Sequence, residues 1–295
     1  MLAKKTMTAA IAALAAVGLM SLTGCGGGAQ SAAPATSEPA APATTSAAAP
    51  ATTSAPATSS APAVDYKLVT PGTLTACADI PYPPFEVEDP NSPTGYSGFD
   101  LDIMGAIAEK LGLKFKVIDV DFNALQSGAV LVTRQCDIGT SAITIKEERK
   151  ANIDFADPYY DSLQSLLVKA SSGITDLKGL SGKTIGVQAG TTGKDYAEAN
   201  APKDAKIVEF PSDGEMWPAI KAGRVDALLQ DQPVNHMHEQ ADPAYKIVAE
   251  YQTNEQYGFA LAKGKRPELL AAVNAALKTM RSDGTYDTIY KKYFG

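Results

Sequence analysis

The stretch Thr140–Lys150, which reads TSAITIKEERK, places small hydroxyl residues ahead of an arginine where an apolar run gives way to a helical pattern. The planar guanidinium group of Arg149 matches a carboxylate through two parallel hydrogen bonds. The hydroxyl groups of Ser141 and Thr144 could add donors beside it, and Thr144 and Glu147 also have the spacing of a helix capping box. We therefore interpret this stretch as a candidate anion site, with an ordinary solvated helix start as the alternative.

Polar residues also stand at the ends of three other apolar runs. Asp79 ends the run that begins at Thr73, and Asp231 ends the run VDALLQD. Thr191 and Thr192 lie in the sequence GTTG at the start of a helical segment, where free N–H groups favour an anion. In open α/β sheets, ligands bind outside the carboxyl ends of the strands. We therefore expect these side chains to border one cleft.

The body of the chain alternates strand-like and helix-like segments, which is the pattern of sheets covered by helices. Residues 73–80 form a continuous apolar run typical of a buried strand, and residues 99–113 have apolar side chains at helical spacing. A second such series covers residues 183–231, and residues 257–264 and 267–284 then read as a strand and a helix. The chain thus forms one series, then a second, and returns to the first with its last segments. This order predicts an α/β fold of two lobes joined by two crossings.

The N-terminus has the pattern of an export signal. Lys4 and Lys5 precede the apolar run Met7–Leu22, which is shorter than the ~20 residues that a bilayer span needs. The run ends in LTGC, which resembles a bacterial lipobox. We predict a signal peptide over residues 1–24 and a lipid on the thiol of Cys25, with an uncleaved short membrane anchor as the alternative.

The segment after Cys25 has the composition of a tether. Residues 26–63 are almost entirely Gly, Ala, Pro, Ser and Thr, which cannot bury enough apolar surface to offset the entropy lost on ordering. We therefore interpret residues 25–65 as a lipidated cysteine followed by a disordered linker. This predicts an extracytoplasmic protein, anchored by lipid to the cell membrane.

Charge and composition exclude several classes of partner and site. The net charge of −7 argues against a nucleic-acid binder. Cys77 and Cys136 lie in apolar strand-like runs, and we interpret them as two buried free thiols, with a disulfide as the alternative. No cysteine pair has metal-ligand spacing, and His236 and His238 stand on a polar, loop-like stretch, so the sequence predicts no metal site and no cofactor.

Seven motifs in order over residues 66–295 resemble one known family, the family 3 extracytoplasmic solute-binding proteins of polar amino-acid ABC importers. They read YPPFE, GFDLD, SAITIKEERK, IDFADPYY, DLKGLSGKTIGVQAGTTG, GRVDALLQD and GTYDTIYKKYFG. The resemblance implies a type II periplasmic-binding-protein clamshell, a monomer in which each lobe is a mostly parallel sheet flanked by helices. Lobe 1 would comprise residues 66–162 and 256–295, and lobe 2 residues 163–255.

The same resemblance implies how a free amino acid would be held. Arg149, Thr144 and Thr192 would bind the α-carboxylate, whereas Asp231, helped by Ser141, would bind the α-ammonium. Ala142 stands where some binders of basic ligands have a serine, so it would supply backbone atoms only. The implied ligand-binding set is Asp79, Tyr82, Phe122, Ser141, Ala142, Thr144, Arg149, Gln188, Thr191, Thr192 and Asp231.

The implied ligand side chain would lie between the rings of Tyr82 and Phe122, with Asp79 at its far end. Two rings and a carboxylate suit a cation, which favours arginine, lysine or ornithine. Glutamine or another neutral polar amino acid is the alternative, because Asp79 can also accept from an amide. The expected role is delivery to an ABC permease after lobe closure about hinges near residues 161–164 and 255–257.

Two other classes of function remain as alternatives. A cleft enzyme, such as a small dehydratase, needs an acid or base in the cleft, and neither histidine lies at a predicted strand end. A sensor ectodomain would act through a partner polypeptide. We expect a binding protein rather than an enzyme.

Overall fold

The computed structural model describes residues 64–295. The predicted signal peptide, Cys25 and most of the predicted tether lie outside these residues. All of the described residues belong to one compact unit. Among them, no helix has both the length and the apolar character needed to cross a bilayer.

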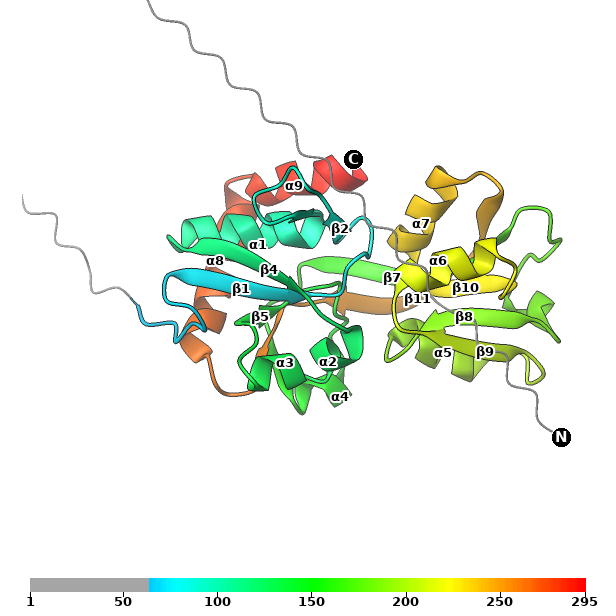
Figure 1. Ribbon diagram of the computed structural model, residues 1–295, viewed down its shortest axis with the longest axis horizontal. Coiled ribbons are helices and arrows are strands. Elements are labelled where there is room, and N and C mark those ends of the chain that lie inside the picture. The colour runs from blue at the N-terminus through cyan, green and yellow to red at the C-terminus, as the bar shows by residue number, and fades with distance from the viewer. Residues whose placement is uncertain (1–63) are drawn as a thin grey trace, which may run out of the picture. The chain divides into compact units, whose positions relative to one another are not determined.

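The first of two five-stranded sheets has the order β4-β1-β5-β12-β6 (Figure 1). Strand β1 pairs in parallel with β4 and β5, while β12 runs antiparallel to both β5 and β6. The strands are β1 (Thr73–Ala78), β4 (Lys114–Asp119), β5 (Ile138–Gly139), β6 (Ile153–Phe155) and β12 (Ala260–Ala262). We call this sheet and its helices the first lobe.

Helices cover both faces of the first sheet (Figure 1). Alternate residues of β1 explain this, because Ala76 packs in one apolar cluster with α1 and α8, whereas Cys77 packs in a second cluster with α2 and α3. The segment after β4 forms two short helices, broken at Gly128, whose φ is 79°. The helices are α1 (Phe99–Lys110), α2 (Phe122–Gln126), α3 (Ala129–Val132), α4 (Glu147–Lys150), α8 (Pro267–Ser282) and α9 (Thr285–Phe294).

The second sheet has the order β11-β7-β10-β8-β9 and also combines parallel and antiparallel pairs. Its strands are β7 (Tyr160–Lys169), β8 (Thr184–Gln188), β9 (Lys206–Phe210), β10 (Ala227–Asp231) and β11 (Tyr245–Tyr257). The helices beside it are α5 (Thr192–Asn200), α6 (Asp213–Lys221) and α7 (Gln232–Ala241), and a short 3-10 turn, η1, covers Leu177–Leu180. We call this group the second lobe. The predicted two-lobe α/β class is confirmed. A two-stranded hairpin, β2 (Val87–Glu88) and β3 (Tyr96–Ser97), lies beside α1.

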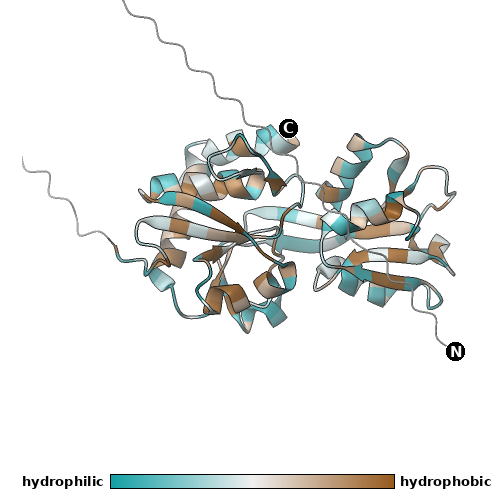
Figure 2. Ribbon diagram, in the orientation of Figure 1, coloured by the Kyte–Doolittle hydropathy of each residue, from teal (hydrophilic) through white to brown (hydrophobic). Residues whose placement is uncertain are grey.

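The chain passes between the lobes twice, along β7 and back along β11, which pair antiparallel. Tyr160 lies opposite Tyr257, and Ser162 lies opposite Glu255. Both segments predicted as crossings therefore lie side by side in one ribbon. Figure 2 shows hydrophilic residues along this ribbon between the two sheets, where the strands leave the apolar cores.

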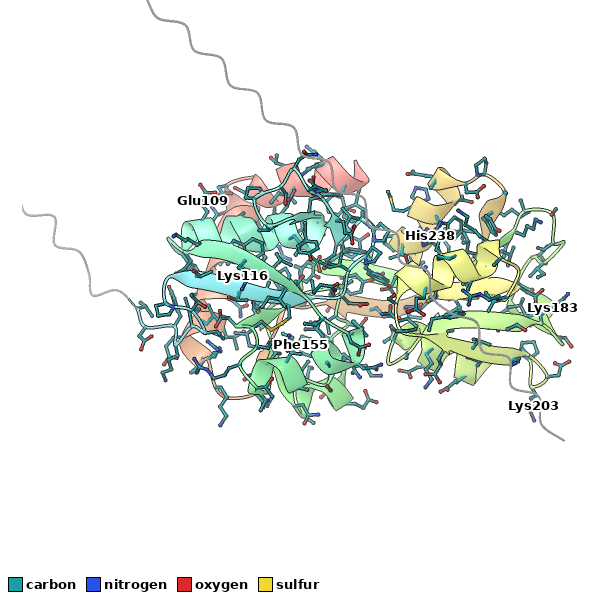
Figure 3. The ribbon with its side chains drawn as sticks, in the orientation of Figure 1. Glu109, Lys116, Phe155, Lys183, Lys203 and His238 are labelled. Atoms are coloured by element: carbon teal, nitrogen blue, oxygen red, sulfur yellow. A yellow bond between two sulfur atoms is a disulfide. The ribbon has the colours of Figure 1, made fainter. Side chains whose placement is uncertain are left out.

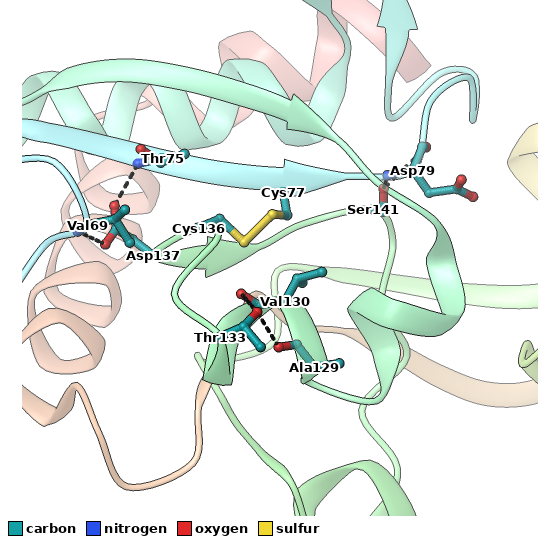
Figure 4. The surroundings of a disulfide bond; sticks show 10 residues. All are labelled: Val69, Thr75, Cys77, Asp79, Ala129, Val130, Thr133, Cys136, Asp137 and Ser141. Carbon is teal, nitrogen blue, oxygen red and sulfur yellow. Dashed lines mark hydrogen bonds between the residues drawn. A yellow bond between two sulfur atoms is a disulfide. The ribbon is translucent and has the colours of Figure 1, made fainter.

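Cys77 and Cys136 form a disulfide bond, so the prediction of two free thiols is wrong (Figure 4). Both residues are buried, as the apolar runs predict. Strands β1 and β5 are parallel neighbours, and Cys136, two residues before β5, has its Cα atom 5.8 Å from that of Cys77, within the range of a disulfide. The sequence shows the burial of each cysteine but not which strands are neighbours. A disulfide agrees with an oxidising compartment.

Candidate ligand-binding cleft

One cavity of about 300 Å³, including space that opens to solvent, lies between the two lobes. The cavity brings together the carboxyl ends of β1, β8 and β10, the loop after β5, and the start of α5. Its lining is the complete set named from the sequence: Asp79, Tyr82, Phe122, Ser141, Ala142, Thr144, Arg149, Gln188, Thr191, Thr192 and Asp231.

Arg149 is a buried cation, with 4% of its surface exposed. Its Nη1 donates to the carbonyl oxygen of Thr144 at 2.8 Å, and its Nη2 donates to the carbonyl oxygen of Gly190, in the other lobe, at 3.0 Å. Its guanidinium carbon lies 5.5 Å from the centre of the Phe122 ring. Burial lowers the pKa of Arg149. None of the ion pairs among residues 64–295 includes Arg149, so its charge lacks a carboxylate partner there.

Asp231 faces Arg149 from the second lobe at the end of β10. Its Oδ2 accepts from the hydroxyl groups of Tyr82 at 2.8 Å and Tyr257 at 2.6 Å, and its Oδ1 accepts from Gln164 Nε2 at 2.5 Å. Burial raises the pKa of Asp231 to about 6, and the negative charge of Glu255 adds to the rise. The carboxyl group would therefore gain from a nearby cation.

Asp79 follows the end of β1 and also lines the cavity, and its side chain accepts one hydrogen bond, from Gln188 Nε2 at 2.6 Å. Burial raises the pKa of Asp79 to about 7 although this hydrogen bond lowers it. The backbone N–H of Asp79 donates to the Ser141 hydroxyl at 2.7 Å. Ser141 thus fixes the end of β1 in this structure, whereas the resemblance assigned it to the ligand ammonium.

Glu255 is a buried acid of the cleft region that the sequence analysis missed. Its Oε2 accepts from Thr192 Oγ1 at 2.7 Å and from Thr144 Oγ1 at 3.0 Å, so it joins hydroxyl groups of both lobes. Gln164 Nε2 lies 3.1 Å from its Oε1. Glu255 and Gln164 stand in polar stretches of the crossing strands, and they are buried because the two lobes meet there. Placement in a predicted crossing is the one signal that could have marked them.

The predicted capping box at Thr144 is wrong. Helix α4 is preceded by Lys146, and no side chain accepts a capping hydrogen bond there. The Thr144 hydroxyl is used by Glu255 instead. In contrast, the Thr191 hydroxyl caps α5 by accepting from the N–H of Lys194 at 3.2 Å.

His236 and His238 lie on α7 rather than on a loop. His238, labelled in Figure 3, is buried against α6, where Nε2 lies 2.8 Å from Asp213 Oδ1 and its ring stacks on Trp217 at 4.3 Å between centroids. Within the described part of the chain, no group of three or more His, Cys, Asp or Glu side chains is placed to hold a metal ion.

The known proteins that this chain resembles are bacterial solute-binding proteins. The family model of the bacterial extracellular solute-binding proteins, family 3, matches residues 74–295. The ABC transporter glutamine-binding protein GlnH of Bacillus subtilis is 35% identical over 212 residues, which cover 71% of this chain and 76% of GlnH. The L-arginine-binding protein of Pseudomonas aeruginosa is 33% identical over 224 residues, covering 72% of this chain and 84% of that protein.

Solved structures extend the comparison. An ancestral arginine-binding protein, 38% identical, matches with a TM-score of 0.71 when bound to glutamine and 0.69 when bound to arginine. The two matches cover 77% and 76% of this chain, respectively, and 99% of the ancestral chain. The ancestral amino acid-binding protein AncCDT-1, described as a precursor of cyclohexadienyl dehydratase, is 37% identical with a TM-score of 0.66, covering 76% of this chain and 96% of its own.

Proposed function

The chain belongs to family 3 of the bacterial extracellular solute-binding proteins, and we propose that it captures a free basic amino acid, such as arginine, lysine or ornithine, between its lobes. The bound amino acid is then passed to an ABC permease in the membrane. The protein acts as a monomer, and a lipid on Cys25 keeps it at the membrane surface. Relatives named for glutamine or arginine support an amino acid as the ligand class.

The balance of buried charge in the cleft carries the choice of a basic ligand. Asp79, Asp231 and Glu255 are buried acids, and Arg149 is the buried cation facing them. A basic amino acid brings two cationic groups and one carboxylate, so it offsets the excess of acid. A glutamate would add a further negative charge, and burying an unpaired charge costs several kcal/mol.

Each end of the ligand has a matching group in the cavity. The α-carboxylate pairs with Arg149, assisted by the N-terminus of α5 at Thr192, where free N–H groups and the helix dipole favour an anion. The α-ammonium pairs with Asp231. The distal cation reaches Asp79 and lies between the rings of Tyr82 and Phe122, where cation–π contact stabilises it.

Closure of the lobes follows from a ligand that touches both. Residues 66–162 with 256–295 move against residues 163–255 about the ribbon of β7 and β11. A ligand that binds the closed form more tightly shifts the population toward it. Contacts that favour closure include the 2.7 Å ion pair between Lys146 and Asp195, which joins α4 to α5.

A thermal-shift screen of the common amino acids and ornithine tests the proposal directly. A ligand that binds only the folded state stabilises it by mass action and so raises the melting temperature. At a ligand concentration of 100 times the Kd, the free energy of unfolding rises by about 2.7 kcal/mol. We expect arginine, lysine or ornithine to give the largest shift. A screen in which no amino acid shifts the melting temperature would refute the proposal.

Glutamine is the second candidate, and one contact favours it. Gln188 already donates an amide hydrogen bond to Asp79, which shows that this carboxyl group can accept from an amide. A largest shift with glutamine would select this candidate over a basic ligand. Mass spectrometry of the ligand recovered after incubation addresses the enzyme alternative, because chemical conversion would contradict a binding-only role.

A further inference from the structure

Two fully buried carboxyl groups, Glu86 and Asp100, lie behind the turn that borders the cavity. Glu86 precedes the β2 strand, and Asp100 stands in the first turn of α1. Asp100 Oδ2 accepts from the backbone N–H groups of Ser141 at 3.1 Å and Ala142 at 2.9 Å. It also accepts from the hydroxyl groups of Thr140 at 3.0 Å and Tyr159 at 2.5 Å.

The remaining oxygens of the pair have no donor if both groups are ionised. Glu86 Oε1 accepts from the Thr140 hydroxyl at 3.3 Å, but Glu86 Oε2 and Asp100 Oδ1 are buried without a hydrogen-bond partner among the described residues. The two carboxyl groups meet at one hydroxyl group, because Thr140 Oγ1 lies 3.3 Å from Glu86 Oε1 and 3.0 Å from Asp100 Oδ2. Two ionised carboxylates offer only acceptors and repel, whereas one proton between them satisfies both.

No cation offsets the pair. Neither Glu86 nor Asp100 takes part in an ion pair within residues 64–295. The titratable groups around the pair include Asp79 at the end of β1, Tyr159 and Tyr160 at the start of β7, and Tyr286 of α9. Asp79 adds negative charge, and Tyr159 donates to Asp100 as a neutral phenol. We propose that Glu86 and Asp100 share one proton, carried by Glu86, and that this pair positions the turn of Ser141 and Ala142 in the cavity.

The surroundings of the two carboxyl groups favour the proton on Glu86 rather than on Asp100. Burial and the negative charge of Asp100 raise the pKa of Glu86 well above its ordinary value. Burial also raises the pKa of Asp100, but the hydrogen bonds from Tyr159 and the Ala142 N–H lower it. Asp100 is therefore the carboxylate that collects donors, and Glu86 is the acid that donates to it.

The turn needs such support because its backbone is unusual. Ser141 and Ala142 have φ values of 98° and 49°, in a region that residues with a Cβ seldom adopt. Asp100 binds both N–H groups of this turn, and the Ser141 hydroxyl in turn fixes the N–H of Asp79. Glu86 and Asp100 are thus positioning residues for the end of the cavity that meets the ligand side chain.

Infrared spectroscopy of the whole chain without ligand tests whether Glu86 is protonated. A protonated carboxylic acid has a carbonyl band above the amide I band, and at pH 7 we expect Glu86→Gln to remove part of that intensity. Asp79→Asn is the control, because Asp79 titrates near this pH and contributes a separate component. If the difference spectrum of Glu86→Gln shows the loss of an ionised carboxylate instead, the shared proton is refuted.

Ligand affinity tests the positioning role, which rests on the proposed function. Glu86→Ala leaves Asp100 Oδ1 without a donor, so we expect affinity for the amino acid to fall about tenfold or more. Glu86→Gln keeps a donor toward Asp100 and an acceptor for Thr140, so it should restore affinity to within about twofold. A tenfold loss in Glu86→Gln would overturn the positioning role. If no amino acid binds the unaltered protein, the proposed function fails while the infrared result still decides the proton.

Discussion

The Tyr82 hydroxyl group donates a 2.8 Å hydrogen bond to Asp231 Oδ2, although the two residues are 149 positions apart and belong to different lobes. Tyr257 donates to the same oxygen from the crossing strand β11. Asp231 is therefore already held by uncharged donors. Under the proposed function, a ligand ammonium would bring the charge that these phenols lack, and binding would exchange a neutral contact between lobes for a charged one.

Replacing Arg149 with alanine should abolish amino-acid binding while the protein stays folded. Removing one partner of a buried charge pair costs about 3–5 kcal/mol, which corresponds to a loss of affinity of about 100-fold or more. Isothermal titration calorimetry measures the affinity, and circular dichroism checks the fold. Lys150→Ala is the matched control, because it removes the neighbouring cation on α4, which is exposed and pairs with Glu147. A loss of affinity of less than about tenfold in Arg149→Ala would refute its role.

Replacing Asp79 with asparagine should change the ligand preference. The amide keeps the size of the side chain but removes the charge that meets a distal cation, so affinity for arginine should fall about 10-fold or more. Affinity for glutamine should fall less. Asp157→Asn is the control, because Asp157 is exposed and only its backbone N–H makes a hydrogen bond. An equal loss for arginine and glutamine would contradict a contact between Asp79 and a cation.

Affinity for a basic amino acid should rise with pH between about 5 and 8. The pKa values of Asp231 and Asp79 are raised to about 6 and about 7, so the free protein retains protons that a cationic ligand must displace. Binding therefore releases protons in this range, and affinity gains about tenfold per pH unit for each group still protonated. Calorimetry in buffers of different ionisation enthalpy counts the protons. Proton uptake on binding would contradict the assignment.

The same two carboxyl groups also determine how the stability of the ligand-free protein changes with pH. Both have pKa values in the folded protein above the ordinary 3.8, so their favourable contribution is present at low pH and is lost as pH rises toward 7. We expect each group to lower the free energy of unfolding by up to about 1.4 kcal/mol per pH unit between its ordinary and raised pKa. Urea unfolding of the protein and of Asp79→Asn measures this slope, which should be smaller in the variant. An unchanged slope would contradict it.

Replacing Cys77 and Cys136 together with alanine should lower the free energy of unfolding by about 2–4 kcal/mol, because the disulfide closes a loop between residues 59 positions apart. Urea unfolding measures the change. Reduction of the unaltered protein with a thiol reagent serves as the comparison and should give a similar loss. Equal stability of the oxidised and reduced forms would contradict the expectation.

The sequence predicted the lining of the cavity well because each lining residue stands at or near the carboxyl end of a strand or the start of a helix. A local rule about strand ends finds Asp79, Thr191 and Asp231, whereas Phe122 and Gln188 were named only through the family resemblance. Their partners depend on neighbours that are distant in sequence. Nothing local shows that the hydroxyl groups of Thr144 and Thr192 meet on Glu255, or that Asp100 serves the turn of residues 140–142.

The disulfide illustrates the same limit in the core. Apolar runs around Cys77 and Cys136 predict burial, because buried strands exclude polar side chains. Which strands lie next to each other is a property of the whole sheet, and β1 has β4 on one side and β5 on the other. The neighbouring positions of β1 and β5 in the sheet, rather than the composition of either strand, bring the two cysteines together.

The disulfide also has a kinetic consequence for ligand capture. Cys77 lies two residues before Asp79, and Cys136 lies five residues before Ser141, so one covalent bond ties together the two strands whose ends form the first-lobe wall of the cavity. That wall stays assembled whether the lobes are apart or together. Under the proposed function, the rate of capture would be governed by collision with this preformed surface, and the residence time by how long the second lobe stays closed over it.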